Sequence, residues 1–144
     1  MRIFIKNETD KNLSVTLFPK LKYLNGDLYD DTAIGGGFRE TTLEITPRLD
    51  EVLYITNDLK IQPNNLTAQV FDSIQISLPD GHINTIKFSP DTVIGYTENL
   101  YKETSHWVYE IRNFNLYTSF QSNPVEFHDY TFVISPDNFM KEIN

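Results

Sequence analysis

The sequence predicts an all-β fold: a two-sheet antiparallel β-sandwich, immunoglobulin-like or jelly-roll-like, with one or two short helices. Three observations lead to this prediction. Apolar residues alternate with polar ones in many short segments, turn-forming residues separate these segments, and the composition is rich in aromatic residues (8 Tyr, 10 Phe) that suit a pleated surface. A length of 144 residues fits a single domain, residues 1–144, with a core of its own.

Nine segments are strand candidates. Strict alternation is typical of a strand with one face toward a core and the other toward water. The alternation is clearest in residues 13–17, 42–46, 74–78, 107–112 and 130–134. Further candidates are residues 2–6, 52–56, 83–89 and 92–96. A doubly wound α/β fold would need a helix after each strand, so this many strands favour a sandwich.

Turn residues stand between several of these segments. Asp80-Gly81 is a dipeptide favoured where a turn needs positive φ. It predicts a hairpin that joins residues 74–78 to residues 83–89. Residues 46–50, which contain Pro47, are expected to connect a second hairpin.

Two short helical pieces are predicted. One begins near Pro63, with Asn64 or Asn65 as its N-cap, and carries the chain between the sheets. The other is a final turn over residues 136–143. Its apolar residues, which we expect to dock on the core, are Phe139, Met140 and Ile143.

The charge balance disfavours two classes of partner. The formal net charge is −8, from 20 acidic and 12 basic residues. Nucleic acids and anionic membrane surfaces both require clustered Lys and Arg, so neither partner is expected. The first 24 residues hold a basic group, which we interpret as solvated residues on an edge strand that oppose aggregation. These residues are Arg2, Lys6, Lys11, Lys20 and Lys22.

The chain has no cysteine, which excludes disulfides and thiolate chemistry. No stretch approaches the about 20 apolar residues of a membrane span. If a leader precedes Met1 in the precursor, we expect a cell-surface or periplasmic protein. If Met1 is the true start, we expect a cytoplasmic one.

Tyrosines in or near predicted loops and strand ends are the candidate ligand-binding residues. Exposed tyrosine supplies contact area at a low entropy cost. The alternative interpretation is that several of them cover sheet edges and hydrogen-bond to the backbone. Both interpretations stay open for Tyr23, Tyr29, Tyr96, Tyr101 and Tyr117.

Three clustered carboxylates form the candidate metal site. Asp27, Asp30 and Asp31 follow the turn dipeptide Asn25-Gly26. Calcium takes six to eight oxygen ligands, some of which such a loop supplies. The spacing does not match an EF-hand, and a solvated acidic loop is the alternative.

No recognisable catalytic arrangement is present in the sequence. There is no nucleophile elbow, and the three histidines lie far apart without metal-ligand spacing. A hydrolase would have to assemble its site from distant residues. Asp72, His106 and His128 are the residues that this hypothesis would test first.

Seven segments together carry a family resemblance. They are FPK (18–20), IGGGF (34–38), VFDSI (70–74), IKFS (86–89), VIGYTENL (93–100), WVYEIR (107–112) and HDYTFVI (128–134). This set resembles a family of small, uncharacterised Bacteroidetes proteins that are exported or lipid-anchored. The resemblance implies an exported precursor with a lipid-bearing cysteine just upstream of Arg2, and it implies no activity, cofactor or catalytic residue.

The leading hypothesis is a non-catalytic binding or accessory domain at a bacterial cell surface. Its ligand would be a glycan or a protein, recognised through loop aromatics and acidic loops, and its only link to a membrane would be the lipid anchor. Two alternatives stay open. One is a cytoplasmic interaction protein of the immunity or adaptor kind, and the other is the hydrolase described above.

Overall fold

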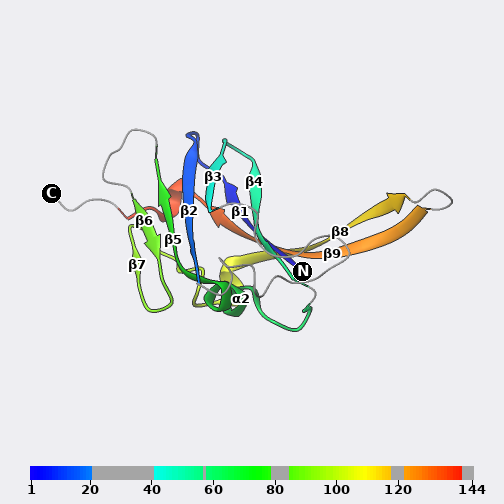
Figure 1. Cartoon of the computed structure of the whole chain (residues 1–144). Coiled ribbons are helices and arrows are strands. Elements are labelled where there is room, and N and C mark those ends of the chain that lie inside the picture. Colours follow the sequence, from blue (N-terminus) through cyan, green and yellow to red (C-terminus); the bar gives the residue numbers. More distant parts are fainter. Residues whose placement is uncertain (21–40, 57, 79–84, 118–121, 141–144) are drawn as a thin grey trace.

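The protein is described from a computed structural model that covers residues 1–20, 41–56, 58–78, 85–117 and 122–140. Two β-sheets pack face to face around one apolar core, which confirms the predicted all-β sandwich (Figure 1). The core draws on both sheets because alternate residues of each strand point inward. Its largest fully buried side chains include Phe71, Phe88, Tyr96 and Phe132.

The first sheet has four strands in the order β4-β1-β9-β8. They are β1 (Arg2–Asn7), β4 (Asp50–Ile55), β8 (Trp107–Tyr117) and β9 (Ser122–Ile134). The second sheet has five strands in the order β3-β2-β5-β6-β7. They are β2 (Leu13–Pro19), β3 (Thr42–Ile45), β5 (Phe71–Ser77), β6 (Ile86–Phe88) and β7 (Val93–Ile94).

Neighbouring strands are antiparallel throughout the described residues, except for β1 and β9. These two run parallel, with Arg2 opposite Asp129 and Asn7 opposite Ile134. This one pair departs from the antiparallel arrangement predicted for the sandwich. Parallel neighbours need a long crossover connection, and here nearly the whole chain lies between the two strands.

Four of the N-terminal basic residues are described: Arg2 and Lys6 lie on β1, and Lys11 and Lys20 lie just outside the ends of β2. Neither strand is an edge strand. β1 lies between β4 and β9, and β2 lies between β3 and β5. The edge-strand interpretation of these residues is therefore wrong. Arg2 and Lys6 lie on β1 and make ion pairs, with Asp129 at 2.6 Å and Glu8 at 2.9 Å.

The connection over residues 46–50 is a crossover and not the predicted hairpin. It leaves β3 in the five-stranded sheet and enters β4 in the four-stranded sheet. Arg48 adopts a positive φ of 71°, and its amide donates to the Asn7 carbonyl at 2.7 Å. The buried Asn7 side chain donates in turn to the Ile45 carbonyl at 2.9 Å, which fixes this corner between the sheets.

The antiparallel neighbours β5 and β6 agree with the predicted pairing of those segments, while the turn between them lies outside the described residues. A short strand, β7, follows, and Gly95 comes directly after it with φ 82°. A Cβ there would lie 2.9 Å from the Thr85 carbonyl oxygen. Glycine is therefore required at this close approach.

One α-helix and two 3₁₀ turns complete the described structure. The helix α2 (Pro63–Val70) begins with Gln62 as its N-cap, so the predicted asparagine caps are wrong. The Asn64 side chain instead accepts from the Thr104 hydroxyl at 2.9 Å. The turns are η1 (Thr104–His106) and η2 (Pro136–Asn138).

The predicted C-terminal turn is confirmed in part. Phe139, directly after η2, packs edge-on against Tyr96 with ring centroids 5.6 Å apart. Met140 is exposed and not docked. Ile143 lies outside the described residues.

Candidate binding surface

The strands β8 and β9 form a long two-stranded ribbon that extends past the other strands (Figure 1). They pair in register from Trp107 opposite Phe132 to Tyr117 opposite Ser122. At the inner end Trp107 and Phe132 are buried in the core. Farther out on the same face of β8, Tyr109 and Ile111 are each 47% exposed. This face therefore passes from core to surface along one strand.

Three rings on this inner face form a surface that we call the aromatic row: Tyr109, His128 and Tyr130. The Tyr109 and Tyr130 ring centroids are 4.8 Å apart. The Tyr109 hydroxyl lies 2.5 Å from Nδ1 of His128, and the two ring planes differ by 21°. Because this contact runs through the hydroxyl, and the centroids are 5.9 Å apart, Tyr109 and His128 lie end to end and widen one flat surface.

A carboxylate holds the histidine of the aromatic row. Nε2 of His128 lies 2.9 Å from Oε1 of Glu126, its neighbour two residues along the same strand face. The arrangement Tyr109–His128–Glu126 resembles the hydroxyl–imidazole–carboxylate order of nucleophilic sites. However, desolvation raises the pKa of Tyr109, and the neighbouring Tyr130 and Glu126 raise it further. The phenol therefore stays neutral, and the arrangement fixes ring orientation rather than generating a nucleophile.

The outer face of the same sheet is built around a buried ion pair. The guanidinium of Arg2 donates to both carboxylate oxygens of Asp129, at 2.8 and 2.6 Å. Asp129 is fully buried, although it points away from the sandwich core. Arg2 also stacks on the ring of Phe127, 3.9 Å from its centroid, and lies 5.1 Å from that of Phe4. Arginine thus covers aromatic surface on the outer face of the sheet.

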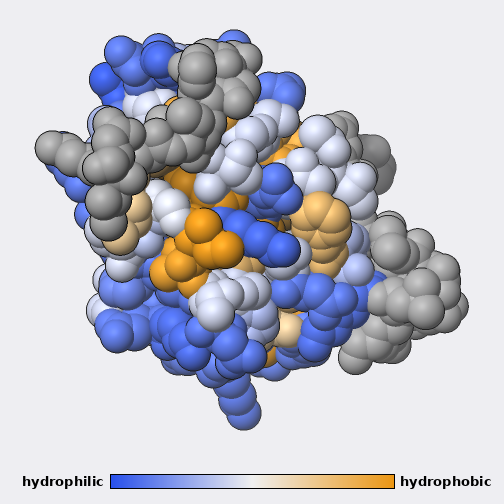
Figure 2. All heavy atoms as spheres, turned by 90° about the vertical axis from the view of Figure 1, so that its left-hand side faces the viewer, coloured by the Kyte–Doolittle hydropathy of each residue, from blue (hydrophilic) through white to orange (hydrophobic). Residues whose placement is uncertain are grey.

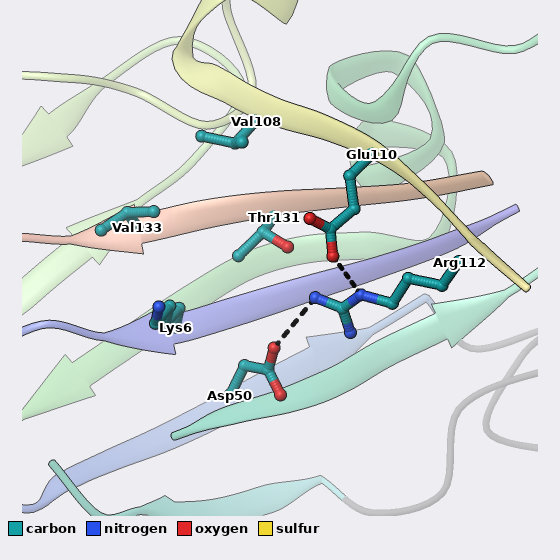
Figure 3. A pocket seen from close by; sticks show the side chains of 7 residues that line it. All are labelled: Lys6, Asp50, Val108, Glu110, Arg112, Thr131 and Val133. Carbon is teal, nitrogen blue, oxygen red and sulfur yellow. Dashed lines mark hydrogen bonds and ion pairs between the residues drawn. The ribbon is translucent and has the colours of Figure 1, made fainter. Parts of the chain in front are cut away.

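A cavity of about 290 Å³ lies on the same outer face (Figure 3). Arg112 reaches across it from β8, with a hydrogen bond to Glu110 and an ion pair to Asp50 at 3.6 Å. The bond to Glu110 raises the pKa of Arg112. The seven lining residues are Lys6, Asp50, Val108, Glu110, Arg112, Thr131 and Val133. Since Lys6 pairs with Glu8, every charged lining residue already has a partner, and the cavity presents no unpaired charge to a ligand.

A second cavity, of about 230 Å³, lies at the end of the molecule away from the ribbon. Its lining is mixed: Thr9, Asp10, Lys11, Leu78, Pro136 and Phe139. Figure 2 views this end and shows apolar side chains gathered near its middle with polar ones around them. No pair of reactive groups converges among those lining residues, so the ribbon remains the stronger candidate.

Two of the five predicted tyrosines are part of the core. The Tyr96 hydroxyl donates to the Val133 carbonyl at 3.1 Å and accepts from the Ser135 amide at 2.9 Å. The Tyr101 hydroxyl donates to the Phe71 carbonyl at 3.0 Å. Burial raises the pKa of both phenols. Both side chains are nearly inaccessible, so the alternative interpretation, backbone-bonded structural tyrosines, applies to these two.

The other predicted site residues are not described. Tyr23, Tyr29, Asp27, Asp30 and Asp31 lie outside the described residues, as does the side chain of Tyr117. The calcium hypothesis therefore stays a prediction. Within the described ranges, no group of three or more His, Asp or Glu side chains is arranged to hold a metal ion.

The three residues of the hydrolase hypothesis are not brought together. His106 lies 3.7 Å from both Glu98 and Glu103 in ion-pair geometry. His128 belongs to the aromatic row, and Asp72 lies on an exposed position of β5. No hydrogen bond or ion pair joins any two of Asp72, His106 and His128, so the hypothesis gains no support.

Sequence reasoning missed the aromatic row because its residues lie in alternating segments. Tyr109 and Tyr130 share the face of Trp107 and Phe132, which predicts burial for all four. The sequence analysis predicts strands only over residues 107–112 and 130–134, whereas β8 has 11 residues and β9 has 13, well beyond the usual strand of about 5–6. Strands of such length are expected to extend past their packing partners.

Comparisons with known proteins found no match among protein-family models, curated proteins or solved structures. The resemblance to exported Bacteroidetes proteins, and the location that it implies, therefore stay predictions. Within the described residues, no helix combines the length and apolar character needed to cross a bilayer.

Proposed function

We propose that this chain is a non-catalytic binding domain and that the aromatic row contacts the ligand. One observation carries the proposal: Tyr109 is 47% exposed on a strand face whose inner end, Trp107 and Phe132, is core. Exposed apolar and aromatic groups on one surface are typical of an interaction site. Tyrosine is suited to this role because it offers large, rigid area with a polar tip.

A polypeptide is the ligand class that these contacts favour. The row lies on the inner face of the ribbon, where Tyr109 is about half exposed, and neighbouring exposed rings of this kind suit the extended surfaces that macromolecular partners cover. Glu126 adds a carboxylate that is more than half exposed, and the whole chain carries a net charge of −8. Cations are attracted both to tyrosine faces and to this charge. We therefore propose a basic segment of a partner protein as the ligand.

The proposal is tested by binding of the purified protein to a library of Lys- and Arg-containing peptides and to a glycan array. We expect binding to basic peptides, and a loss of about 10-fold or more in affinity for Tyr109→Ala, as for a central interface residue. Val108→Ala, next to it but on the opposite face, is the matched control and should bind as the wild type does.

Three outcomes would contradict this function. Equal binding by the wild type and Tyr109→Ala would remove the row from the interface. Binding confined to the glycan array would replace the polypeptide by a sugar. Turnover in a screen of hydrolase substrates, retained in Tyr109→Ala, would favour an enzyme with a site elsewhere.

The compartment of this binding domain is a separate part of the proposal. We propose the cell surface or periplasm, and the support is the family resemblance carried by the seven segments named above. Reading the gene upstream of Met1 tests this point. A leader with a lipid-bearing cysteine is the expected result, whereas an in-frame start at Met1 with no leader favours a cytoplasmic interaction protein.

A further inference from the structure

Among the strands that the structure describes, β8 is a sheet edge unlike the other three. The edges β3, β4 and β7 have 4, 6 and 2 residues, whereas β8 has 11. Short edges are one of the ways in which proteins prevent strand addition, together with Pro and Lys. The β8 segment WVYEIRNFNLY contains no Pro, Gly or Lys. One side of this strand pairs with β9, and no strand within the described residues pairs with the other side.

The side chains of β8 have a pattern centred on Ile111. Glu110 precedes it and Arg112 follows it, and both lie on the outer face. Tyr109 and Asn113 flank it at two residues' distance on the inner face. In an antiparallel pair of identical strands whose two-fold axis passes through Ile111, each Glu110 faces an Arg112. Opposite charges that face each other across strands stabilise such a pair.

We propose that a second copy of this chain adds to the free edge of β8, antiparallel, about a two-fold axis at Ile111. The two four-stranded sheets then form one continuous sheet. Each Glu110 lies opposite Arg112 of the partner subunit, and the two Ile111 side chains face each other. The proposal goes beyond the proposed function because it uses the edge of the strand and leaves the aromatic rows accessible on the inner face.

The charge pattern favours a second copy over an unrelated strand. A foreign strand would need its own acid and base at the matching positions, whereas a second copy always supplies them. The Glu110 side chain is 54% exposed, so it can reach a neighbour across the edge. Arg112, 39% exposed, lies over its own sheet, where it pairs with Asp50 and Asp129, and the partner's Glu110 would approach it there. The carboxylate of Glu110, which bonds Arg112 of its own chain, can accept a further hydrogen bond from the partner's Arg112.

The first experiment uses the absence of cysteine from the chain. Residues opposite each other in an antiparallel pair have Cα atoms about 4.5–5.5 Å apart, within the roughly 4.4–6.8 Å that a disulfide spans. Ile111→Cys should therefore form a disulfide with its counterpart under mild oxidation and run as a dimer without reductant. The matched control is Ile94→Cys, exposed on the short edge β7, which should stay monomeric. Equal cross-linking of the two variants would overturn the proposal.

The second experiment tests the position of the two-fold axis by placing charged side chains on it. Sedimentation velocity of the wild type should show a concentration-dependent dimer. Ile111→Lys and Ile111→Asp should each weaken this dimer at least 10-fold, because like charges then face each other on the axis, and an equal mixture of the two should restore it. Because Ile111 is about half exposed, both variants should keep the wild-type circular dichroism spectrum. A monomeric wild type, or a mixture that stays monomeric, would overturn the proposal.

These outcomes are independent of the proposed ligand. If the wild type is monomeric but Tyr109→Ala loses peptide binding, the dimer is wrong and the binding function stands. If Ile111→Cys cross-links while peptide binding is absent, the dimer stands and the binding function is wrong.

Discussion

The inner ends of β8 and β9, which belong to the sandwich body, and the part of the β8–β9 ribbon farther out differ in what covers them. In the body, Phe132 is 1% exposed against the five-stranded sheet. On the same face of the ribbon, Tyr109, which lies opposite Tyr130 and two residues from Trp107, is 47% exposed. Alternation therefore determines which way a side chain points, and the opposite sheet determines whether it is buried.

The outer face of the four-stranded sheet shows the converse. Phe4, Phe127 and Asp129 point away from the core, yet all three are buried. Arg2 and Arg112 lie over these side chains and supply the cover. On this face, arginine side chains of the sheet itself bury the aromatic rings, where a second sheet would otherwise be needed.

The largest expected effect separates body from ribbon. Phe132→Ala should lower the free energy of unfolding by about 3–5 kcal/mol, since it removes a ring that packs on Phe88 and Trp107 and leaves a cavity. Ile111→Ala on the ribbon should cost less than about 1 kcal/mol, as for an exposed position. Urea unfolding followed by circular dichroism measures both. Equal losses would mean that the ribbon is packed as tightly as the body.

A smaller effect is expected at the buried ion pair. Asp129→Asn removes the carboxylate that Arg2 binds through two hydrogen bonds and one of the three that surround Arg112. We expect a loss of about 2–3 kcal/mol, below the value for fully buried pairs because both arginines are partly exposed. Glu110→Gln, an exposed partner of Arg112, is the control and should cost about 0.5 kcal/mol or less. If the two substitutions cost the same, Asp129 does not organise the outer face.

The smallest effect at neutral pH is expected from the buried tyrosines. Burial raises the pKa of Tyr96 and Tyr101 in the folded protein, whereas an unfolded tyrosine titrates near pH 10. The folded state therefore favours the neutral phenols. The stability that comes from this difference is fully present below pH 10 and is lost as the pH rises above it. Tyrosinate absorbance should rise together with unfolding, and Tyr101→Phe should reduce the alkaline loss. Ionisation of all tyrosines before unfolding would contradict this.

Much of the fold was predictable because hydrophobic alternation is local. The pattern in residues 74–78 predicts β5, and Pro63 predicts the start of α2. Strand partners are not encoded in this way. Nothing within residues 2–6 indicates that β1 pairs with β9 and not with β2, and the Pro47 turn chemistry is equally compatible with a hairpin and with the crossover observed.

The candidate site was less predictable than the fold. Tyr96 and Tyr101 lie in segments without regular alternation, which favours exposure, yet their hydroxyls reach backbone carbonyls inside the protein. Tyr109 lies in a regular strand, which favours burial, yet it is exposed. In both cases the decisive factor is a contact between residues far apart in sequence, and periodicity carries no information about such contacts.

The parallel pairing of β1 with β9 determines when this protein can finish folding. β1, a middle strand of its sheet, is made early in translation. Its neighbour β9 comes about 115 residues later, on the order of 6–23 s at elongation rates of about 5–20 residues per second. During that interval one side of β1 has no native partner. Late closure of this kind slows folding and makes the nascent chain a natural client for chaperones.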